Sequence, residues 1–202
     1  MTDLFLQLGL TIIIAYIIGA IPTGYLIVKS KTGDDIRTIG SGSTGATNVK
    51  RVLGKKWFFI TLLLDALKGA TPVILAKLFI SAGAKFGLAP VLASIAVIIG
   101  HSKSYFLNFK GGKSVASGVG TILALNWLVG AIIAVIWGTI TYTTKYVSVG
   151  SIIALLISPL LMFFFHAPIA YVIYCALGAI YIVYLHRENI KRLLAGNENK
   201  VR

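Results

Sequence analysis

Apolar residues in this chain form long, nearly uninterrupted runs, and the segments between the runs hold most of the charged side chains. A surface helix of a soluble protein would instead repeat its apolar residues every three or four positions. A membrane-spanning helix needs about 20 apolar residues, which is the length scale of these runs. The pattern therefore predicts an all-α integral membrane protein. The runs cover residues 4–28, 57–80, 88–100, 115–142, 149–165 and 169–185.

The run at 115–142 does not fit a single crossing. As one helix it would be about 42 Å long, against a hydrocarbon core of about 30 Å, yet it is short for two full crossings. Asn126 and Trp127 lie near its middle and would suit a turn at a membrane interface. The sequence leaves open whether this run is one long helix or a hairpin of two short helices.

The distribution of basic residues predicts the topology. Most of the 19 lysines and arginines lie in segment 29–56, in the tail after Leu185 and in two shorter loops. Cytoplasmic loops carry an excess of Lys and Arg, so all these segments are expected inside, which requires the hairpin at 115–142. We expect a compact bundle of about seven transmembrane helices, with the N-terminus outside and the C-terminus cytoplasmic. No linker or charge block divides residues 1–202, so a single transmembrane domain is predicted.

Charge and composition exclude several classes of protein. The net charge of +13 is compatible with nucleic-acid binding, but the basic residues lie in loops between apolar runs, where anionic lipid is the simpler partner. Cys175 is the single cysteine, so no intramolecular disulfide can form. No His, Cys, Asp or Glu residues show metal-ligand spacing, and we expect neither a metal nor a cofactor.

A polar segment at 101–118 has the composition of an anion site. Glycines let backbone N–H groups turn inward as a nest, and a helix starting at Val115 would point its positive end at the same ligand. Phosphate is the ligand this predicts, and the alternative is a plain cytoplasmic loop whose lysines only fix orientation. The sequence Gly112-Lys113-Ser114 in this segment resembles the end of a P-loop. Leu107 occupies the position of the first P-loop glycine, so an ATPase is excluded. The central residues are Lys110, Gly111, Gly112 and Lys113.

A second polar stretch, GSGSTGATN at 40–48, is followed closely by Lys50 and Arg51. It formally fits the dinucleotide-binding pattern G-x-G-x-x-G, but no buried strand precedes it and no βαβ unit follows. A second anion nest is the better interpretation. The alternative is a flexible Gly/Ser linker.

Polar residues near the last run and inside the second run are further candidates. In HRENIKRLLAGNE at 186–198, His186 and Asn189 share one helix face, although an amphipathic helix on the lipid surface would show the same pattern. Ser148 ends a short loop predicted on the same side of the membrane. Asp65 and Lys68 are three residues apart and therefore share a helix face. They are expected to form an ion pair inside the membrane, or Asp65 has a catalytic role.

These three polar segments resemble the three loop motifs of the bacterial acyl-phosphate:glycerol-3-phosphate acyltransferases. The first segment has Ser43 where asparagine is usual in that family. The second, HSKSYFLNFKGGKSVAS, has Ser104 in place of a proline and Ser114 in place of a glycine, and the third is HRENIKRLLAGNE. The resemblance extends over the whole chain in the order of the motifs and the number of spans.

The resemblance implies transfer of a fatty acyl group from acyl phosphate to the 1-hydroxyl of sn-glycerol 3-phosphate. The products would be lysophosphatidic acid and phosphate, in the first acylation of phospholipid synthesis. It also implies a multi-pass protein of the bacterial plasma (inner) membrane with its active site facing the cytoplasm. We expect a monomer in contact with membrane lipids and no nucleic acid. The alternative is a transporter or channel for an organic phosphate, but the candidate residues crowd one face, which favours the enzyme.

Candidate site residues follow from the chemistry and the resemblance. Acyl phosphate carries a good leaving group, so stabilising the developing charge matters more than a strong base. We expect Arg51 and Lys110 to hold glycerol phosphate. We expect His186 to orient the attacking hydroxyl or to act as its base. A substrate phosphate or water is the alternative proton acceptor. The expected catalytic residues are His186, Asn189, Lys110 and Ser148. The expected substrate-binding residues are Ser41, Gly42, Thr47, Asn48, Arg51, Lys110, Gly111, Gly112 and Lys113, with the Gly111–Gly112 nest taking the acyl phosphate.

Overall fold

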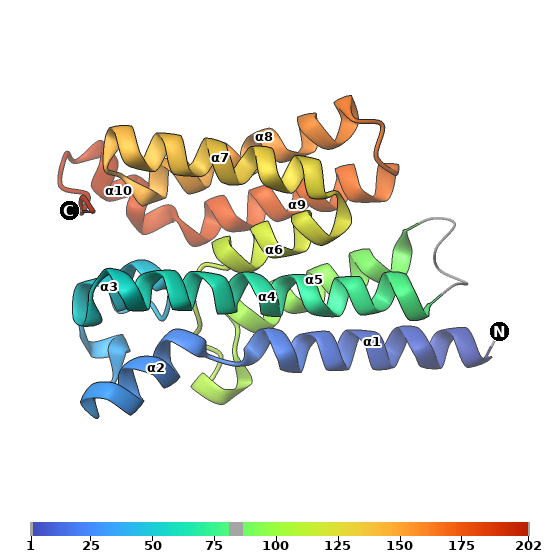
Figure 1. The fold of residues 1–202 in the computed structure, drawn as a ribbon, viewed down its shortest axis with the longest axis horizontal. Coiled ribbons are helices and arrows are strands. Elements are labelled where there is room, and N and C mark those ends of the chain that lie inside the picture. Colours follow the sequence, from blue (N-terminus) through green and yellow to red (C-terminus); the bar gives the residue numbers. More distant parts are fainter. Residues whose placement is uncertain (1, 81–86, 202) are drawn as a thin grey trace. The chain divides into compact units, whose positions relative to one another are not determined.

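A computed structural model describes residues 2–80 and 87–201, and all regular elements in these ranges are helical (Figure 1). The predicted all-α class is therefore confirmed. Two short 3₁₀ turns, η1 (Ile36–Thr38) and η3 (Tyr105–Leu107), lie between the α-helices. The α-helices are α1 (Thr2–Ala20), α2 (Thr23–Thr32), α3 (Ala46–Leu53), α4 (Lys55–Phe79), α5 (Leu88–Ser102), α6 (Val115–Leu125), α7 (Trp127–Thr144), α8 (Val147–Phe164), α9 (Ile169–Leu185) and α10 (Arg187–Leu194).

Membrane-spanning length is reached by five helical stretches among the described residues. A sixth span results if α9 and α10, which are bent by 60° relative to each other, count together. Helix α6 is apolar but has only 11 residues. The integral membrane class is confirmed, and the total of about seven spans and their orientation stay predictions. The five stretches are Asp3–Thr32, Lys55–Phe79, Leu88–Leu107, Trp127–Thr144 and Val147–Phe164.

The long apolar run at 115–142 is broken at Asn126. Its side-chain oxygen accepts hydrogen bonds from the backbone N–H groups of Leu128 and Val129, both at 3.1 Å, which caps the start of α7. A Cβ on Gly130 would lie 2.6 Å from Cα of Leu123, so the two helices approach closely beyond the turn. Of the two possibilities left open by the sequence, the structure has the hairpin.

Contacts between helices divide the chain into two compact units, Met1–Thr121 and Ile122–Arg202. In the first unit α1 packs along α5, and α4 packs against both α5 and α3. In the second unit α8 packs against α7 and α9. The prediction of one domain over residues 1–202 stays untested.

The first apolar run, predicted as one span, consists of two helices, because α1 ends at Ala20 and α2 begins at Thr23. Pro22 causes the break, since proline has no N–H to donate and its ring clashes with the preceding turn. Carbonyls freed by a break inside a membrane must find other partners. The Ala20 carbonyl accepts from Ser104 Oγ at 2.5 Å, and the Ile21 carbonyl accepts from Lys68 Nζ at 2.6 Å. The break therefore draws polar side chains from α4 and from the loop after α5.

Candidate functional site

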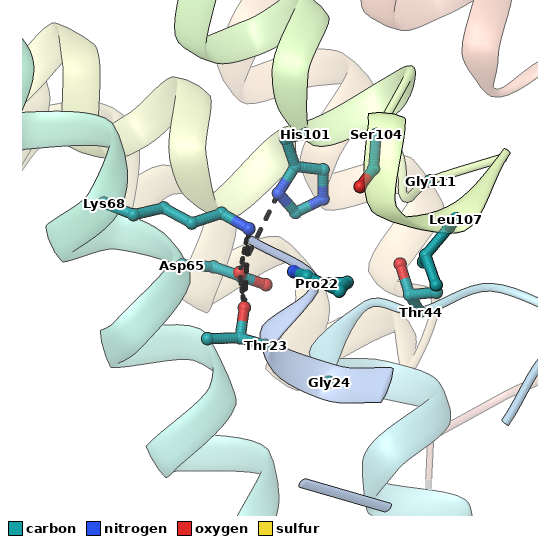
Figure 2. A pocket seen from close by; sticks show the side chains of 10 residues that line it. All are labelled: Pro22, Thr23, Gly24, Thr44, Asp65, Lys68, His101, Ser104, Leu107 and Gly111. Atoms are coloured by element: carbon teal, nitrogen blue, oxygen red, sulfur yellow. Dashed lines mark hydrogen bonds and ion pairs between the residues drawn. The ribbon is translucent and has the colours of Figure 1, made fainter. Parts of the chain in front are cut away.

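A small cavity lies in the first unit beside the break between α1 and α2 (Figure 2). Its volume is about 10 Å³, enough for roughly one water molecule. Helices α4 and α5 and the loops at 40–45 and 103–114 contribute the other walls. The lining residues are Pro22, Thr23, Gly24, Thr44, Asp65, Lys68, His101, Ser104, Leu107 and Gly111.

A buried ion pair forms one wall of this cavity. Lys68 Nζ lies 2.9 Å from Asp65 Oδ1, and their side chains are only 8% and 2% exposed. The same carboxylate accepts a hydrogen bond from the Thr23 hydroxyl (Figure 2). The ammonium also donates to the Ile21 carbonyl. Buried charges persist when they are paired and fully hydrogen-bonded, as here. The ion pair considered from the sequence is therefore present, and Lys68 caps the negative end of α1.

His101 joins this ion pair to the second motif. Its Nδ1 lies 2.9 Å from Ser117 Oγ, on the first turn of α6, and 3.8 Å from Asp65 Oδ1. The residue is buried at the end of α5. The sequence placed His101 inside the second motif but gave it no role, because its partners lie on α4 and α6.

The glycine pair of the second motif works differently from the nest predicted for it. The Gly111 N–H donates to the Ser102 carbonyl and the Gly112 N–H to the His101 carbonyl, both at 3.1 Å. These two N–H groups hold the loop on the end of α5, so they do not form a nest for an anion. Lys110 is exposed beside them, and Lys113 is half-buried. The expected substrate contacts of Lys110 and Lys113 stay predictions.

Asn48 organises the first motif. Its amide nitrogen donates to the carbonyls of Ile39 at 2.8 Å, Ser43 at 3.0 Å and Ile36 at 3.2 Å. Its side-chain oxygen accepts from the Ser41 N–H at 3.1 Å. The N–H groups of the amide are thus used in holding its own loop, and the hydrogen bond that Asn48 was expected to donate to substrate has no support in this arrangement. The other predicted residues of the motif are more accessible: Ser41, Gly42 and Arg51 are exposed, and Thr47 is half-buried.

In the second unit, a single carboxylate joins two predicted site residues. Glu198 Oε1 accepts from Ser148 Oγ at 2.9 Å and from Asn189 Nδ2 at 2.6 Å, while Oε2 accepts from Arg192 Nε at 2.7 Å. The Glu198 side chain is only 5% exposed. Sequence reasoning missed this role, although Glu198 is the last residue of the third motif and one of the two acidic residues of a basic tail.

The Glu198 carboxyl is held in its charged form. Burial raises its pKa, but the hydrogen bonds from Asn189, Arg192 and Ser148 outweigh burial and hold the pKa below its ordinary value. Its stabilising contribution is therefore present above the pKa of the unfolded chain, and is lost as the pH falls through the lower folded value.

His186 lies at the bend between α9 and α10 and is 3% exposed. Its Nδ1 lies 2.8 Å from the Ile182 carbonyl oxygen. A carbonyl only accepts hydrogen bonds, so Nδ1 carries the hydrogen and the neutral ring has its lone pair on Nε2. This is the tautomer that a general base needs. Asn189 follows one helical turn later, as predicted from the spacing.

The predicted site residues thus fall into two groups. Ser148 and Asn189 meet at Glu198 in the second unit, which also contains His186. The residues of the first two motifs lie in the first unit. No group of three His, Cys, Asp or Glu side chains that could share a metal ion occurs in residues 2–80 and 87–201.

Known proteins match this chain over nearly its whole length. A sequence model of the glycerol-3-phosphate acyltransferases matches residues 9–196. The chain belongs to this family. The glycerol-3-phosphate acyltransferase of Nostoc sp. is 41% identical over 206 residues, which cover 96% of this chain and 91% of the relative. The one from Gloeobacter violaceus is 44% identical over 188 residues, which cover 93% and 91%.

Two crystal structures of family members share the fold. Both are of PlsY (YgiH), an integral membrane glycerol 3-phosphate acyltransferase. The glycerol 3-phosphate form has a TM-score of 0.91 at 35% identity, and the lysophosphatidic acid form has 0.89 at 34%. Each match covers 97% of this chain and 96% of the other. Family membership therefore rests on fold as well as on sequence.

Replacing Glu198 by alanine should loosen the second group. It removes the shared acceptor of Ser148 and Asn189, and hydrogen bonds to charged groups contribute about 1.5–3 kcal/mol each before solvent screening. We expect a lower midpoint of thermal unfolding in detergent at pH 7, and a kcat reduced several-fold. Glu188→Ala is the matched control, because Glu188 is an exposed glutamate on α10. Equal unfolding midpoints for the two variants would contradict this role.

Proposed function

We propose that this chain transfers a fatty acyl group from acyl phosphate to the 1-hydroxyl of glycerol 3-phosphate, giving lysophosphatidic acid and inorganic phosphate. The main support is the match over 97% of the chain to a glycerol 3-phosphate form of a family member. The choice of acyl phosphate as donor has separate support. The common thioester-using acyltransferases have a histidine followed five residues later by an aspartate, and none of the three histidines in this sequence is followed in that way. The enzyme is proposed to act as a monomer.

The reaction has one bond-forming and one bond-breaking event at the acyl carbon. The 1-hydroxyl oxygen attacks the carbonyl carbon, the bond from that carbon to the phosphate oxygen breaks, and the hydroxyl proton leaves. His186 is proposed to take the proton at Nε2, the nitrogen left with the lone pair when Nδ1 donates to Ile182. Lys110 is proposed to hold the phosphate of glycerol 3-phosphate together with Arg51. The hydroxyl of Ser148 and the amide of Asn189, both fixed by Glu198, are proposed to orient the attacking hydroxyl.

Arg51 is proposed to hold the phosphate of the acceptor. It is exposed on α3, one helical turn after Asn48. Arg51→Ala should raise KM for glycerol 3-phosphate and lower kcat/KM by about tenfold to a hundredfold, the range of a charge-assisted contact. Arg51→Lys should recover only part of the loss, because an ammonium lacks the planar fork of a guanidinium. Lys55→Ala, a nearby exposed cation, is the control, and an equal loss in it would show an unspecific charge effect.

The proposed topology has seven spans, with α6 as the short one, the N-terminus outside and the three motifs facing the cytoplasm of a bacterial cell. Its support is the concentration of basic residues in the motif-bearing segments. Single cysteines at the exposed positions Lys31, Lys103 and Lys200, in a Cys175→Ala background, should react with an impermeant thiol reagent only from the cytoplasmic side. Labelling of positions 31 and 200 from opposite sides would contradict the seven-span arrangement.

The donor is the part of the proposal that an assay can test at once. Purified protein in detergent is given glycerol 3-phosphate with palmitoyl phosphate, palmitoyl-CoA or palmitoyl-acyl carrier protein, and lysophosphatidic acid is measured. We expect product from palmitoyl phosphate alone. Product from either thioester at a comparable rate would overturn the proposed donor.

A further inference from the structure

His101 connects the buried ion pair to the glycine loop of the second motif. Its imidazole faces Ser117 and Asp65 on one edge and Gly112 on the other. Its own carbonyl accepts the Gly112 N–H. One residue therefore contacts the loop through both its backbone and its side chain.

The imidazole is held firmly on its inner edge. Ser117 Oγ lies 2.9 Å from Nδ1, and Ser117 is fully buried. Asp65 lies beyond at 3.8 Å, and is itself fixed by Lys68 and Thr23 (Figure 2). A ring inside such a packed and hydrogen-bonded shell keeps one rotamer.

The outer edge of the ring sets the position of Gly112. A Cβ on Gly112 would collide with His101 Nε2 and would lie 3.1 Å from Cδ2. The φ of Gly112 is not positive, so close contact alone demands a glycine here. At Gly111 the obstacle is different, because a Cβ there would meet the main-chain oxygen of His101. The two glycines therefore respond differently to the His101 side chain.

The position of this loop determines where Lys110 leaves it. Asn108 and Phe109 have positive φ values of 51° and 60°, which non-glycine residues adopt only when surrounding structure holds them. The Phe109 N–H donates to the Ser104 carbonyl at 2.8 Å, and the Lys110 N–H to the Leu107 carbonyl at 3.1 Å. A shift at Gly112 is thus passed directly to the Lys110 backbone two residues away.

We propose that His101 is a positioning residue for the reaction: held by Ser117, its ring fixes Gly112 and so the place of Lys110 relative to the acceptor's phosphate. This inference rests on the proposed function, in which Lys110 contacts a substrate phosphate. His101 itself touches no substrate. Its loss acts on substrate binding through the loop.

Single variants test the direction of the effect. His101→Ala should raise KM for glycerol 3-phosphate about tenfold and leave kcat within about twofold. His101→Asn, which keeps a polar atom near the position of Nδ1 but lacks the outer edge of the ring that meets Gly112, should recover little of the affinity. Ser117→Ala should raise KM about threefold. Ser94→Ala is the matched control, because Ser94 is an equally buried serine whose hydroxyl only donates to Pro90 within α5, and its KM should equal that of the parent.

A double-mutant cycle tests the contact itself. Gly112→Ala should raise KM because its Cβ meets the ring, and adding His101→Ala should then cause no further rise. Gly111→Ala combined with His101→Ala should instead show additive increases in KM. The Cβ at position 111 meets the main-chain oxygen of residue 101, which the His101→Ala change does not remove. Additive increases in KM for the pair Gly112→Ala and His101→Ala would overturn the proposal. An unaltered KM in folded His101→Ala protein would also overturn it. If His101→Ala fails to fold, Ser117→Ala against Ser94→Ala decides, and equal KM values overturn it.

The outcome separates this inference from the proposed function. A parent protein that makes no lysophosphatidic acid from glycerol 3-phosphate and acyl phosphate refutes the proposed function. An active parent whose Ser117→Ala and His101→Ala variants keep the parent KM refutes only the positioning role.

Discussion

Replacing His186 by alanine is expected to lower kcat by roughly 10²-fold or more, while KM for glycerol 3-phosphate changes little. The reason is the tautomer: Nδ1 donates to the Ile182 carbonyl, so Nε2 has the lone pair that takes the proton of the attacking hydroxyl. Steady-state kinetics with saturating acyl phosphate measure both constants. His166→Ala is the matched control, since His166 is an exposed histidine between α8 and α9.

His186→Gln distinguishes a base from a hydrogen-bonding group. Glutamine keeps a polar atom near Nε2 but accepts no proton at neutral pH, so the rate should stay low. Recovery of most of the rate in this variant would assign the proton to a substrate phosphate or to water. Unaltered kcat and KM in folded His186→Ala protein would remove His186 from the site.

Replacing Asp65 by alanine is expected to lower the free energy of unfolding by about 3–5 kcal/mol, the cost of breaking a buried ion pair on one side. The change leaves the Lys68 ammonium, 8% exposed, without its counter-charge, and the Thr23 hydroxyl without its acceptor. Titration with SDS in mixed micelles measures the loss. Asp34→Ala is the control, because Asp34 is an exposed aspartate of the same chain.

The double variant Asp65→Ala/Lys68→Ala shows whether the uncompensated charge is the cause. Removing both charges should cost less than removing Asp65 alone, since no unpaired ammonium remains buried. A double variant less stable than Asp65→Ala would contradict this explanation. It would assign the larger role to the hydrogen bond from Lys68 to the Ile21 carbonyl.

The sequence predicted the helical segments well where run length alone decides them. The turn at Asn126 was considered because its run is too long for one crossing, and the amide cap then fixed the hairpin. The break at Pro22 was missed, because the apolar run continues through it. What makes the break tolerable are Ser104 and Lys68, which come from distant parts of the chain and bond the freed carbonyls.

The candidate site was predictable as segments but not as contacts. Gly111 and Gly112 were predicted to offer N–H groups to an anion, yet the end of α5 already accepts both hydrogen bonds. Glu198 lies 50 positions from Ser148, and His101 lies 16 from Ser117, so no local pattern indicates either pair. Residue types and spacing indicate which segments carry chemistry. Partners are set by tertiary packing.

The central claim is acyl transfer from acyl phosphate to glycerol 3-phosphate, and the fate of one oxygen atom tests it most directly. Acyl phosphate is labelled with ¹⁸O at the oxygen that bridges carbon and phosphorus, and the purified protein is supplied with glycerol 3-phosphate. Attack at the carbonyl carbon predicts that the label leaves in inorganic phosphate, with one phosphate released per lysophosphatidic acid formed. Label retained in the fatty acyl product, or phosphate released equally fast without glycerol 3-phosphate, would contradict the account.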